Sequence, residues 1–239
     1  MVKNLLITTT GKYNHLDKWF NGERNFDVAL INYDRHEDPD DLVYRCVYYD
    51  TFTTFKYPGL WDVFWDEPRL LRYNYFWMPD EDIDLSCKEI NKLFNRMKEL
   101  NLDLAQPSIE KSDTSFPSWE CFIHKENTDV IYTNFIEITC PCFGRDALGK
   151  CLDTFKESQS GWGLDLVWTK LIGDKSNNIA IINSIIAKHT RPVRGGGLYD
   201  SLQKKEISPS KERKQLMRKY GIPAIDIKIH GHSISNKHI

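Results

Sequence analysis

Two carboxylates one residue apart, Asp80 and Asp82, follow an apolar and aromatic run that ends at Met78. The run, residues 73–78, has the composition of a buried β-strand, so both side chains are expected at the sheet edge where open α/β sheets bind ligands. Paired carboxylates suit Mg²⁺ or Mn²⁺, which complete their coordination with water and substrate phosphates. The spacing favours metal-dependent chemistry on a nucleotide diphosphate. An acidic turn that only solvates a loop end would have the same sequence.

A second segment whose residues could bind a substrate or take part in catalysis runs from Gly161 through Trp162 and Gly163 to Asp165. The two glycines allow a tight turn beside a substrate, and the indole between them offers that substrate a flat face. Asp165 is expected at or just inside a helix start, where its carboxylate could take a proton from an acceptor hydroxyl. The alternative is a loop anchored in the core by Trp162, with Asp165 as a helix cap.

A third group follows the apolar strand predicted at residues 179–183 and comprises His189, Arg191 and Arg194. The imidazole could complete the coordination of a metal ion, and the two guanidinium groups could balance the charge of a diphosphate. A lone histidine is also common as a satisfied surface or core residue, so this assignment depends on the neighbouring arginines.

Glu137 lies near the end of the strand predicted over residues 130–138. A carboxylate at a strand end could hold acceptor hydroxyls by accepting their hydrogen bonds. The alternative is a structural ion pair between Glu137 and Arg145 at the strand end.

These residues must be positioned by an alternation of strands and helices along the chain. The clearest helix is 84–100, where Ile90, Leu93, Phe94 and Met97 repeat at helical spacing. Such alternation predicts an α/β fold with a mostly parallel central sheet flanked by helices, in one Rossmann-like domain over residues 1–200. Residues 201–239 are expected to form a C-terminal helical extension and a polar tail. The other predicted strands are 4–9, 26–33, 43–49 and 102–107; the other predicted helices are 15–20, 147–157, 164–171 and 211–220.

Composition narrows the class of protein. The 239 residues are 41% hydrophobic, enough for one core, and the formal charge of −2 offers no general attraction for nucleic acid. Six cysteines without a CxxC pair predict reduced thiols in a cytoplasmic protein, rather than zinc ligands drawn from Cys140, Cys142, Cys151 and His124. We expect no signal peptide and no membrane span. The basic segment 211–219 is expected to be a solvated helix face, with contact to an anionic membrane as the alternative.

The order of these features resembles GT-A glycosyltransferases, and more narrowly a glycosyltransferase-like family of plants and bacteria. The resemblance covers residues 4–190 and departs from the pattern at Pro79, which precedes the acidic triplet. It depends on five motifs in a shared order: Phe26-Asp27-Val28 with Tyr33-Asp34, Trp77 with Asp80-Glu81-Asp82, Ala105-Gln106-Pro107, Phe135-Ile136-Glu137, and Gly161 to Asp165.

The resemblance implies a nucleotide-sugar donor, with a UDP-sugar favoured, and an inverting transfer to a glycan or lipid-linked acceptor. Mn²⁺ or Mg²⁺ would stabilise the leaving nucleotide, and Asp165 would be the general base. The implied setting is bacterial surface polysaccharide synthesis in the cytoplasm, with possible peripheral contact to the membrane's inner face. The remaining implied contacts are Thr8, Thr9, Thr10 and Asp34 with the nucleoside; Lys56, Arg191 and Arg194 with the diphosphate; Asp80, Asp82 and His189 with the metal; Glu137 and Trp162 with the acceptor.

Two other classes of function fit the same residues. A metal-dependent phosphoryl-transfer or hydrolytic enzyme would use the same carboxylate-bound cation and release its product without an acceptor. A non-catalytic carbohydrate-binding protein would use the aromatic surfaces and bind glycans without nucleotide or cation.

Overall fold

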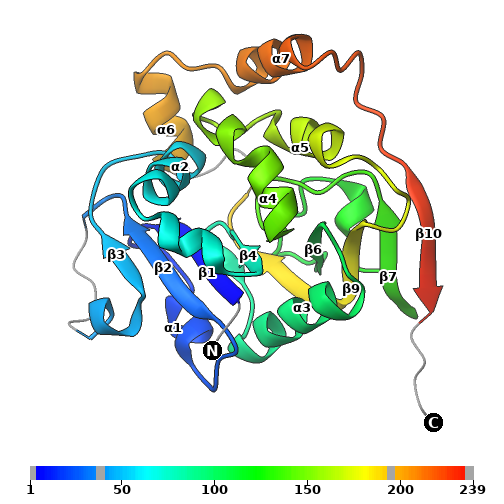
Figure 1. Cartoon of the computed structure of the whole chain (residues 1–239), viewed down its shortest axis with the longest axis horizontal. Helices are drawn as coiled ribbons and strands as arrows, with labels where there is room; N and C mark the ends of the chain where they lie inside the picture. Colours follow the sequence, from blue (N-terminus) through cyan, green and yellow to red (C-terminus); the bar gives the residue numbers. More distant parts are fainter. Residues whose placement is uncertain (1–3, 36–40, 193–196, 235–239) are drawn as a thin grey trace.

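The computed structural model describes residues 4–35, 41–192 and 197–234, which form one central sheet with helices on both sides (Figure 1). The strands are β1 (Asn4–Thr10), β2 (Asp27–Asn32), β3 (Tyr48–Asp50), β4 (Tyr75–Trp77), β5 (Ile83–Asp84), β6 (Leu104–Ile109), β7 (Thr128–Thr133), β8 (Cys142–Gly144), β9 (Ile179–His189) and β10 (Ile229–Ile234). The α-helices are α1 (Leu16–Phe20), α2 (Lys56–Asp66), α3 (Cys87–Glu99), α4 (Arg145–Cys151), α5 (Leu164–Ile172), α6 (Gly197–Lys204) and α7 (Pro209–Lys219). Short 3₁₀ segments lie at Val43–Arg45, Pro68–Arg72, Glu120–Phe122 and Leu152–Glu157.

The sheet is mixed, with the strand order β10-β7-β9-β6-β8-β4-β1-β2-β3 and with β5 paired to β9. Parallel pairs join β1 to β2 and β4, β2 to β3, and β6 to β9. The short strand β8 runs antiparallel between β4 and β6, and β7 is antiparallel to both β9 and β10. The α/β class is therefore confirmed, but the expectation of a mostly parallel sheet is wrong because β8 and the β7–β10 edge reverse the strand direction.

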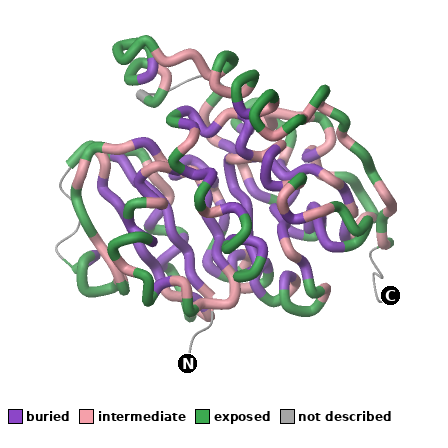
Figure 2. Tube along the Cα trace, turned by 45° about the horizontal axis from the view of Figure 1, so that its top comes forward, coloured by how far each residue is buried: buried purple, intermediate pink, exposed green. Residues whose placement is uncertain are grey.

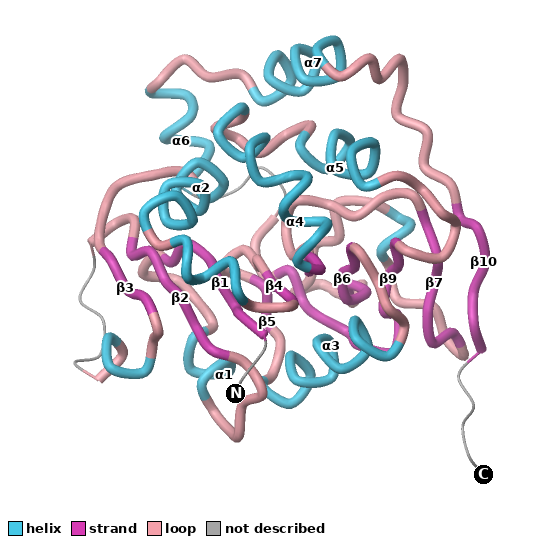
Figure 3. The backbone as a smooth tube through the Cα atoms, in the orientation of Figure 1, coloured by secondary structure: helices cyan, strands magenta, loops and turns pink. Residues whose placement is uncertain are grey.

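Helices cover both faces of the sheet. Helices α2, α4 and α5 lie on one side, and α1 and α3 lie on the other (Figures 1 and 3). Buried residues concentrate in the strands between these layers, whereas the outer turns and the C-terminal helices are largely exposed (Figure 2). Within the described residues, no helix combines the length and the apolar character needed to cross a membrane.

The best-predicted elements have strong local patterns. Strand β1 is buried from Leu5 onward, and its first half, Leu5 to Ile7, is apolar on both faces, as expected for a strand covered by helices on both sides. Helix α3 buries one stripe against the sheet, and its first turn is capped by Ser86, whose Oγ accepts from the Glu89 backbone N–H at 3.3 Å. The hydrophobic spacing alone predicts this helix to within three residues at each end.

The C-terminal part of the chain was predicted as a helical extension and a polar tail. Helices α6 and α7 follow one another over α2, α4 and α5, and the chain then descends to the sheet edge (Figure 3). There, Ile229 to Ile234 form β10, which pairs antiparallel with β7. The tail prediction is therefore wrong for these residues, because the exposed backbone of β7 offers hydrogen-bond partners that side-chain polarity does not reveal.

Candidate active site

The acidic triplet 80–82 occupies the loop that leaves β4, and backbone bonds on both sides fix its position. The Met78 N–H donates to the Pro141 carbonyl at 2.9 Å, and the Asp80 N–H donates to the Thr139 carbonyl at 2.5 Å. On the far side, β5 pairs with β9 so that Ile83 lies opposite His189. Pairing between β5 and β9 therefore brings the triplet and His189 together, although more than one hundred residues separate them in sequence.

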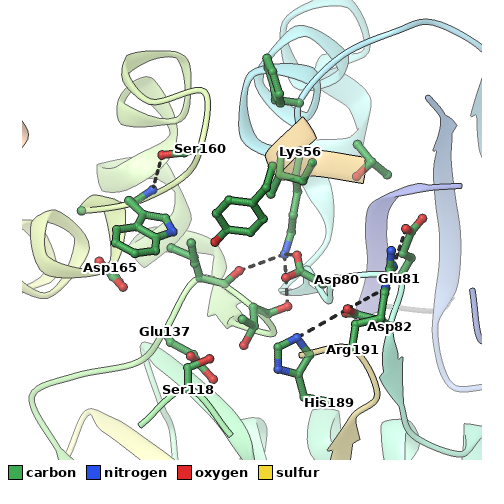
Figure 4. A pocket seen from close by; sticks show the side chains of 18 of the residues that line it. Lys56, Asp80, Glu81, Asp82, Ser118, Glu137, Ser160, Asp165, His189 and Arg191 are labelled. Carbon is green, nitrogen blue, oxygen red and sulfur yellow. Dashed lines mark hydrogen bonds and ion pairs between the residues drawn. The ribbon is translucent and has the colours of Figure 1, made fainter. Parts of the chain in front are cut away.

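Side chains of the triplet point in different directions (Figure 4). The Asp80 side chain is 36% exposed and faces a cavity, where its Oδ1 accepts from Lys56 Nζ at 2.7 Å. Glu81 is only 8% exposed and points inward. Its carboxylate accepts from the Gly11 backbone N–H and from the Tyr33 hydroxyl. Asp80 is thus available to a ligand, while Glu81 ties the triplet to the loop after β1.

Asp82 forms a compact charged group with His189 and Arg191. Arg191 Nε donates to Asp82 Oδ2 at 2.9 Å, and His189 Nε2 lies 3.5 Å from the same oxygen. The His189 Nδ1–H donates to the Phe116 carbonyl at 2.8 Å, which fixes the ring. Burial lowers the pKa of His189, but the hydrogen bond and charge of Asp82 outweigh it and raise that pKa to about 9. The imidazole is therefore held mainly as a cation by Asp82.

The residues predicted to hold a metal ion can be tested against this geometry. Asp82 Oδ1 is buried and has no hydrogen-bond partner among the described residues, and Asp80 presents its carboxylate to the cavity. These hard oxygen donors fit Mg²⁺ or Mn²⁺. No three His, Cys, Asp or Glu side chains of the described residues are grouped so as to hold a metal ion by themselves. A cation here would therefore be shared with substrate phosphates, as Mg²⁺ commonly is.

Asp165 is positioned by the glycine turn before α5. Gly161 and Gly163 have φ of 79° and 94°, a region in which side chains cause strain, and the helix begins at Leu164 directly afterwards. Asp165 lies in the first turn, lines the cavity, and its Oδ1 accepts from the Leu166 N–H at 2.9 Å. Burial raises the pKa of Asp165 to about 7, with a further rise from Glu137. A carboxyl with this pKa can exchange a proton near neutral pH.

Glu137 is buried on the same side of the cavity as Asp165 (Figure 4). Strand β7 ends at Thr133, so Glu137 lies in the following loop and not at the predicted strand end; its backbone N–H donates to Gln106 Oε1 at 2.9 Å, which fixes that loop. Burial raises the pKa of its carboxyl group, and hydrogen bonds from Thr139 and Ser118 oppose that rise. The alternative ion pair with Arg145 does not form, because that guanidinium donates to the Tyr73 carbonyl at 2.6 Å.

One cavity of about 490 Å³ collects most of the residues predicted from sequence. Its described lining does not include Thr8, Thr10 or Asp34. The Thr8 hydroxyl donates to the Pro79 carbonyl behind the triplet, and Asp34 accepts from the Lys12 N–H at 3.0 Å. Arg194 lies outside the described residues. The predicted residues that line the cavity are Thr9, Lys56, Asp80, Asp82, Glu137, Trp162, Asp165, His189 and Arg191.

Comparison with known proteins places this site in a family. The family described as protein of unknown function (DUF707) matches residues 64–223, two thirds of the chain, including the acidic triplet, Asp165 and α7. The chain belongs to the DUF707 family. A search of curated proteins gave no match.

The DUF707 chain also resembles solved structures of S. aureus TarS. The complex of TarS residues 1–349 with UDP-GlcNAc aligns with a TM-score of 0.58 and 12% identity, over 92% of this chain and 66% of that one. TarS 1–349 described without a ligand aligns with a TM-score of 0.54 and 11% identity, over 77% and 59%. A UDP complex gives 0.51 and 10%, over 90% and 70%. The DUF707 chain thus spans less than two thirds of the first two structures, and at this identity the likeness shows the fold.

Several lining residues of the DUF707 site were missed by sequence reasoning. Tyr33 was noted only as part of a strand end, and Glu81 only as the middle of the triplet. Ser118, Lys205 and Arg213 come from a loop and from C-terminal segments that no motif marked. The sequence predicts a helix at residues 211–220, where α7 lies, but it does not predict the surface on which α7 packs.

The turn before Asp165 permits a stability test with a matched control. A Cβ on Gly163 would lie 2.9 Å from the Arg213 Cα and would require φ of 94°, whereas a Cβ on Gly149 in α4 would meet nothing within 4 Å. We expect Gly163→Ala to lower the free energy of unfolding by more than about 1 kcal/mol. Gly149→Ala should raise it by about 0.5–1 kcal/mol. Urea denaturation of both variants measures the two signs, and equal effects would contradict the close packing at Gly163.

Proposed function

We propose that this chain is a glycosyltransferase that moves a sugar from a nucleotide-sugar, with a UDP-sugar as donor, to an acceptor hydroxyl. The observation that carries the proposal is the pairing, in one cavity, of the acidic triplet with a carboxyl group whose pKa is raised to about 7. A fold shared with a protein crystallised with UDP-GlcNAc and UDP supports the donor class. The cavity volume of about 490 Å³ suits a ligand of this size.

Donor binding would use the side of the cavity next to β1 and the triplet. Thr9 lines it there, and Lys56 and Arg191 bring positive charge that a diphosphate could share with the acidic residues. Asp80 and Asp82 would hold Mn²⁺ or Mg²⁺ together with phosphate oxygens of the donor. His189 would join them as a third ligand only after releasing its proton and moving towards the cation, because the three side chains are not grouped for this as they stand. The bound cation would neutralise charge that develops on the leaving nucleotide. Thr8, Thr10 and Asp34 would support the nucleoside from behind the cavity wall.

Transfer would use the opposite side of the cavity. The Asp165 carboxylate would take the proton of the acceptor hydroxyl as its oxygen attacks the anomeric carbon. The bond from that carbon to the diphosphate oxygen would break, and the nucleoside diphosphate would leave with the bonding electron pair. Direct attack of this kind inverts the anomeric configuration. Glu137 would accept hydrogen bonds from other acceptor hydroxyls, and Trp162 would pack against the acceptor ring.

The acceptor and the setting complete the proposal. A glycan or lipid-linked acceptor in bacterial surface polysaccharide synthesis would place the protein in the cytoplasm at the inner face of the membrane. Residues 1–200 would form the catalytic domain, with residues 201–239 as its C-terminal extension.

A pH profile tests the role of Asp165. Because burial raises the pKa of this carboxyl to about 7, the base is protonated and inactive below that pH. With UDP-sugar and an acceptor both saturating, we expect kcat for UDP release to rise about tenfold per pH unit below pH 7 and to level off above pH 8. Affinity for UDP over the same range is the control. A flat kcat between pH 5.5 and 8 would contradict the assignment.

The class of function is tested by a thermal-shift and turnover screen of nucleotide-sugars with and without Mn²⁺. A transferase is expected to be stabilised by its donor and to form product only with an acceptor. Release of free sugar or phosphate at full rate without an acceptor would favour the hydrolytic alternative. Glycan binding that needs neither nucleotide nor cation would favour a carbohydrate-binding protein.

A further inference from the structure

The C-terminal segment forms one wall of the candidate active site. Helix α6 lies beyond α2, and α7 lies beyond α5, on the side of these helices that faces away from the sheet (Figures 1 and 3). Sequence reasoning assigned this segment no role in the site. The side chains that it contributes to the lining are Leu198, Tyr199, Ser201, Lys205, Arg213 and Ile225.

A partly buried cluster of hydrogen bonds connects helix α7 to the loop before Asp165. Glu212 accepts from the backbone N–H groups of Gln159 at 2.8 Å and Ser160 at 2.9 Å, and from the Ser160 hydroxyl at 2.5 Å. Ser160 Oγ in turn accepts from the Trp162 N–H at 3.2 Å. Because a carboxylate with several donors makes strong, directional bonds, the position of α7 relative to Trp162 is defined.

This attachment places the next residue, Arg213, over the acceptor side of the cavity. Its guanidinium carbon lies 5.4 Å from the centroid of the Trp162 ring. Burial raises the pKa of Asp165, and the nearby positive charge of Arg213 opposes that rise. Lys205 lines the same cavity, and its Nζ lies 4.8 Å from the centroid of the Phe55 ring. Both cations therefore rest on aromatic faces.

The lysines and arginines of the cavity divide into two groups. Lys56 forms an ion pair with Asp80 at 2.7 Å, and Arg191 forms ion pairs with Asp82 and Glu81. Within the described chain, Lys205 and Arg213 form no ion pair with an acidic side chain. A cation–π contact leaves the hydrogen-bond donors of a guanidinium free for an anion, and the planar group binds phosphate or carboxylate through two donors.

We propose that Arg213 and Lys205 form a subsite for an anionic group, a phosphate or a carboxylate, carried by the sugar that accepts the transferred residue. The inference depends on the proposed transferase function and adds the chemical class of its acceptor. Trp162 would lie under the acceptor ring, and the anionic group would point towards the C-terminal wall, away from the acidic triplet.

The experiment is a calorimetric titration of the full chain saturated with UDP. The probes are glucose, glucose 6-phosphate and glucuronate, so the two charged sugars separate phosphate from carboxylate recognition. We expect at least one of them to bind about tenfold more tightly than glucose, since hydrogen bonds to charged groups are worth that much. Arg213→Gln should abolish this preference, and Lys205→Gln should reduce it about threefold. Affinity for UDP should not change in either variant.

Lys214→Gln is the matched control, because it removes one positive charge from the exposed part of α7 without touching the cavity. Arg213→Lys should restore part of the preference, which a purely structural role in packing on Trp162 would not predict. If Arg213→Gln does not fold, charge reversal in the exposed Lys205→Glu takes its place, with loss of the preference expected.

Three results would overturn the inference. Equal affinity for glucose and both charged sugars would exclude an anionic subsite. Competition between the charged sugar and UDP would place the anion in the diphosphate site instead. If the preference for a charged sugar survives both Arg213→Gln and Lys205→Gln, other residues must bind the anionic group. Failure of UDP to bind the wild-type chain would contradict the proposed donor, whereas UDP binding without an anionic preference would contradict only the acceptor subsite.

Discussion

Asp165→Asn is expected to lower kcat for sugar transfer by about 10²–10⁴-fold, the usual contribution of a well-placed general base. Asparagine keeps the size of the side chain and an oxygen that can accept from the Leu166 N–H, so the turn before α5 should keep its shape. Asp165 also lies across the cavity from the acidic triplet (Figure 4). Donor affinity should therefore change by less than about twofold, a difference well under 1 kcal/mol. Steady-state kinetics and UDP titration measure the two effects separately.

The matched control for this variant is Asp146→Asn. Asp146 also lies in the first turn of a helix, α4, but it is exposed and does not line the cavity. Its replacement should leave kcat unchanged. The Asp165→Asn profile should also lose the inflection near pH 7 that the wild-type carboxyl produces. Turnover within about threefold of wild type would assign the base elsewhere, with Glu137 as the next carboxyl group on that side of the cavity.

Prediction from sequence worked where a local pattern determines the structure. Runs of branched apolar residues predict β1 and β2, and helical spacing predicts α3, because each pattern matches the period of one element. The prediction of a mostly parallel sheet failed because the strand directions depend on β8, a three-residue strand that lies between β4 and β6. So short a segment has no period of its own, and its partners are distant in sequence.

The site was predicted as a set of residues but not as a set of contacts. Asp80 and Asp165 do line one cavity, because strand ends and helix starts gather at the same edge of an α/β sheet. Sequence reasoning gave Glu81 no role. Its side chain, between Asp80 and Asp82, points inward and accepts a hydrogen bond from the Gly11 N–H, which fixes the loop. Arg213 could not be found, since its place depends on the packing of α7 by Glu212 onto a loop more than fifty residues earlier.

The Asp80→Asn/Asp82→Asn double variant is expected to lose at least about a hundredfold in affinity for UDP measured with Mn²⁺. The reason is that both carboxylates are able to bind a cation. Asp82 Oδ1 is buried and has no hydrogen-bond partner in the described part of the chain, and Asp80 faces the cavity, so each carboxylate offers a cation negative charge that an amide would not supply. In the variant, Lys56 loses its acidic partner and Arg191 keeps only Glu81, so without Mn²⁺ both cations can meet the diphosphate more readily. Affinity for UDP measured without the cation should therefore fall little or even rise.

Asp84→Asn provides the matched control, because Asp84 follows the triplet closely and pairs with Lys18 at 2.6 Å but does not line the cavity. Its loss removes a neighbouring ion pair without touching the site, so the effect of Mn²⁺ on UDP affinity should persist. Calorimetry with and without Mn²⁺ on all three proteins gives the comparison. If the wild type binds UDP equally well in both conditions, or if the double variant keeps the full effect of Mn²⁺, the carboxylates do not hold the cation. Lys56, His189 and Arg191 would then be the groups that neutralise the diphosphate, and the acidic triplet would serve to position them.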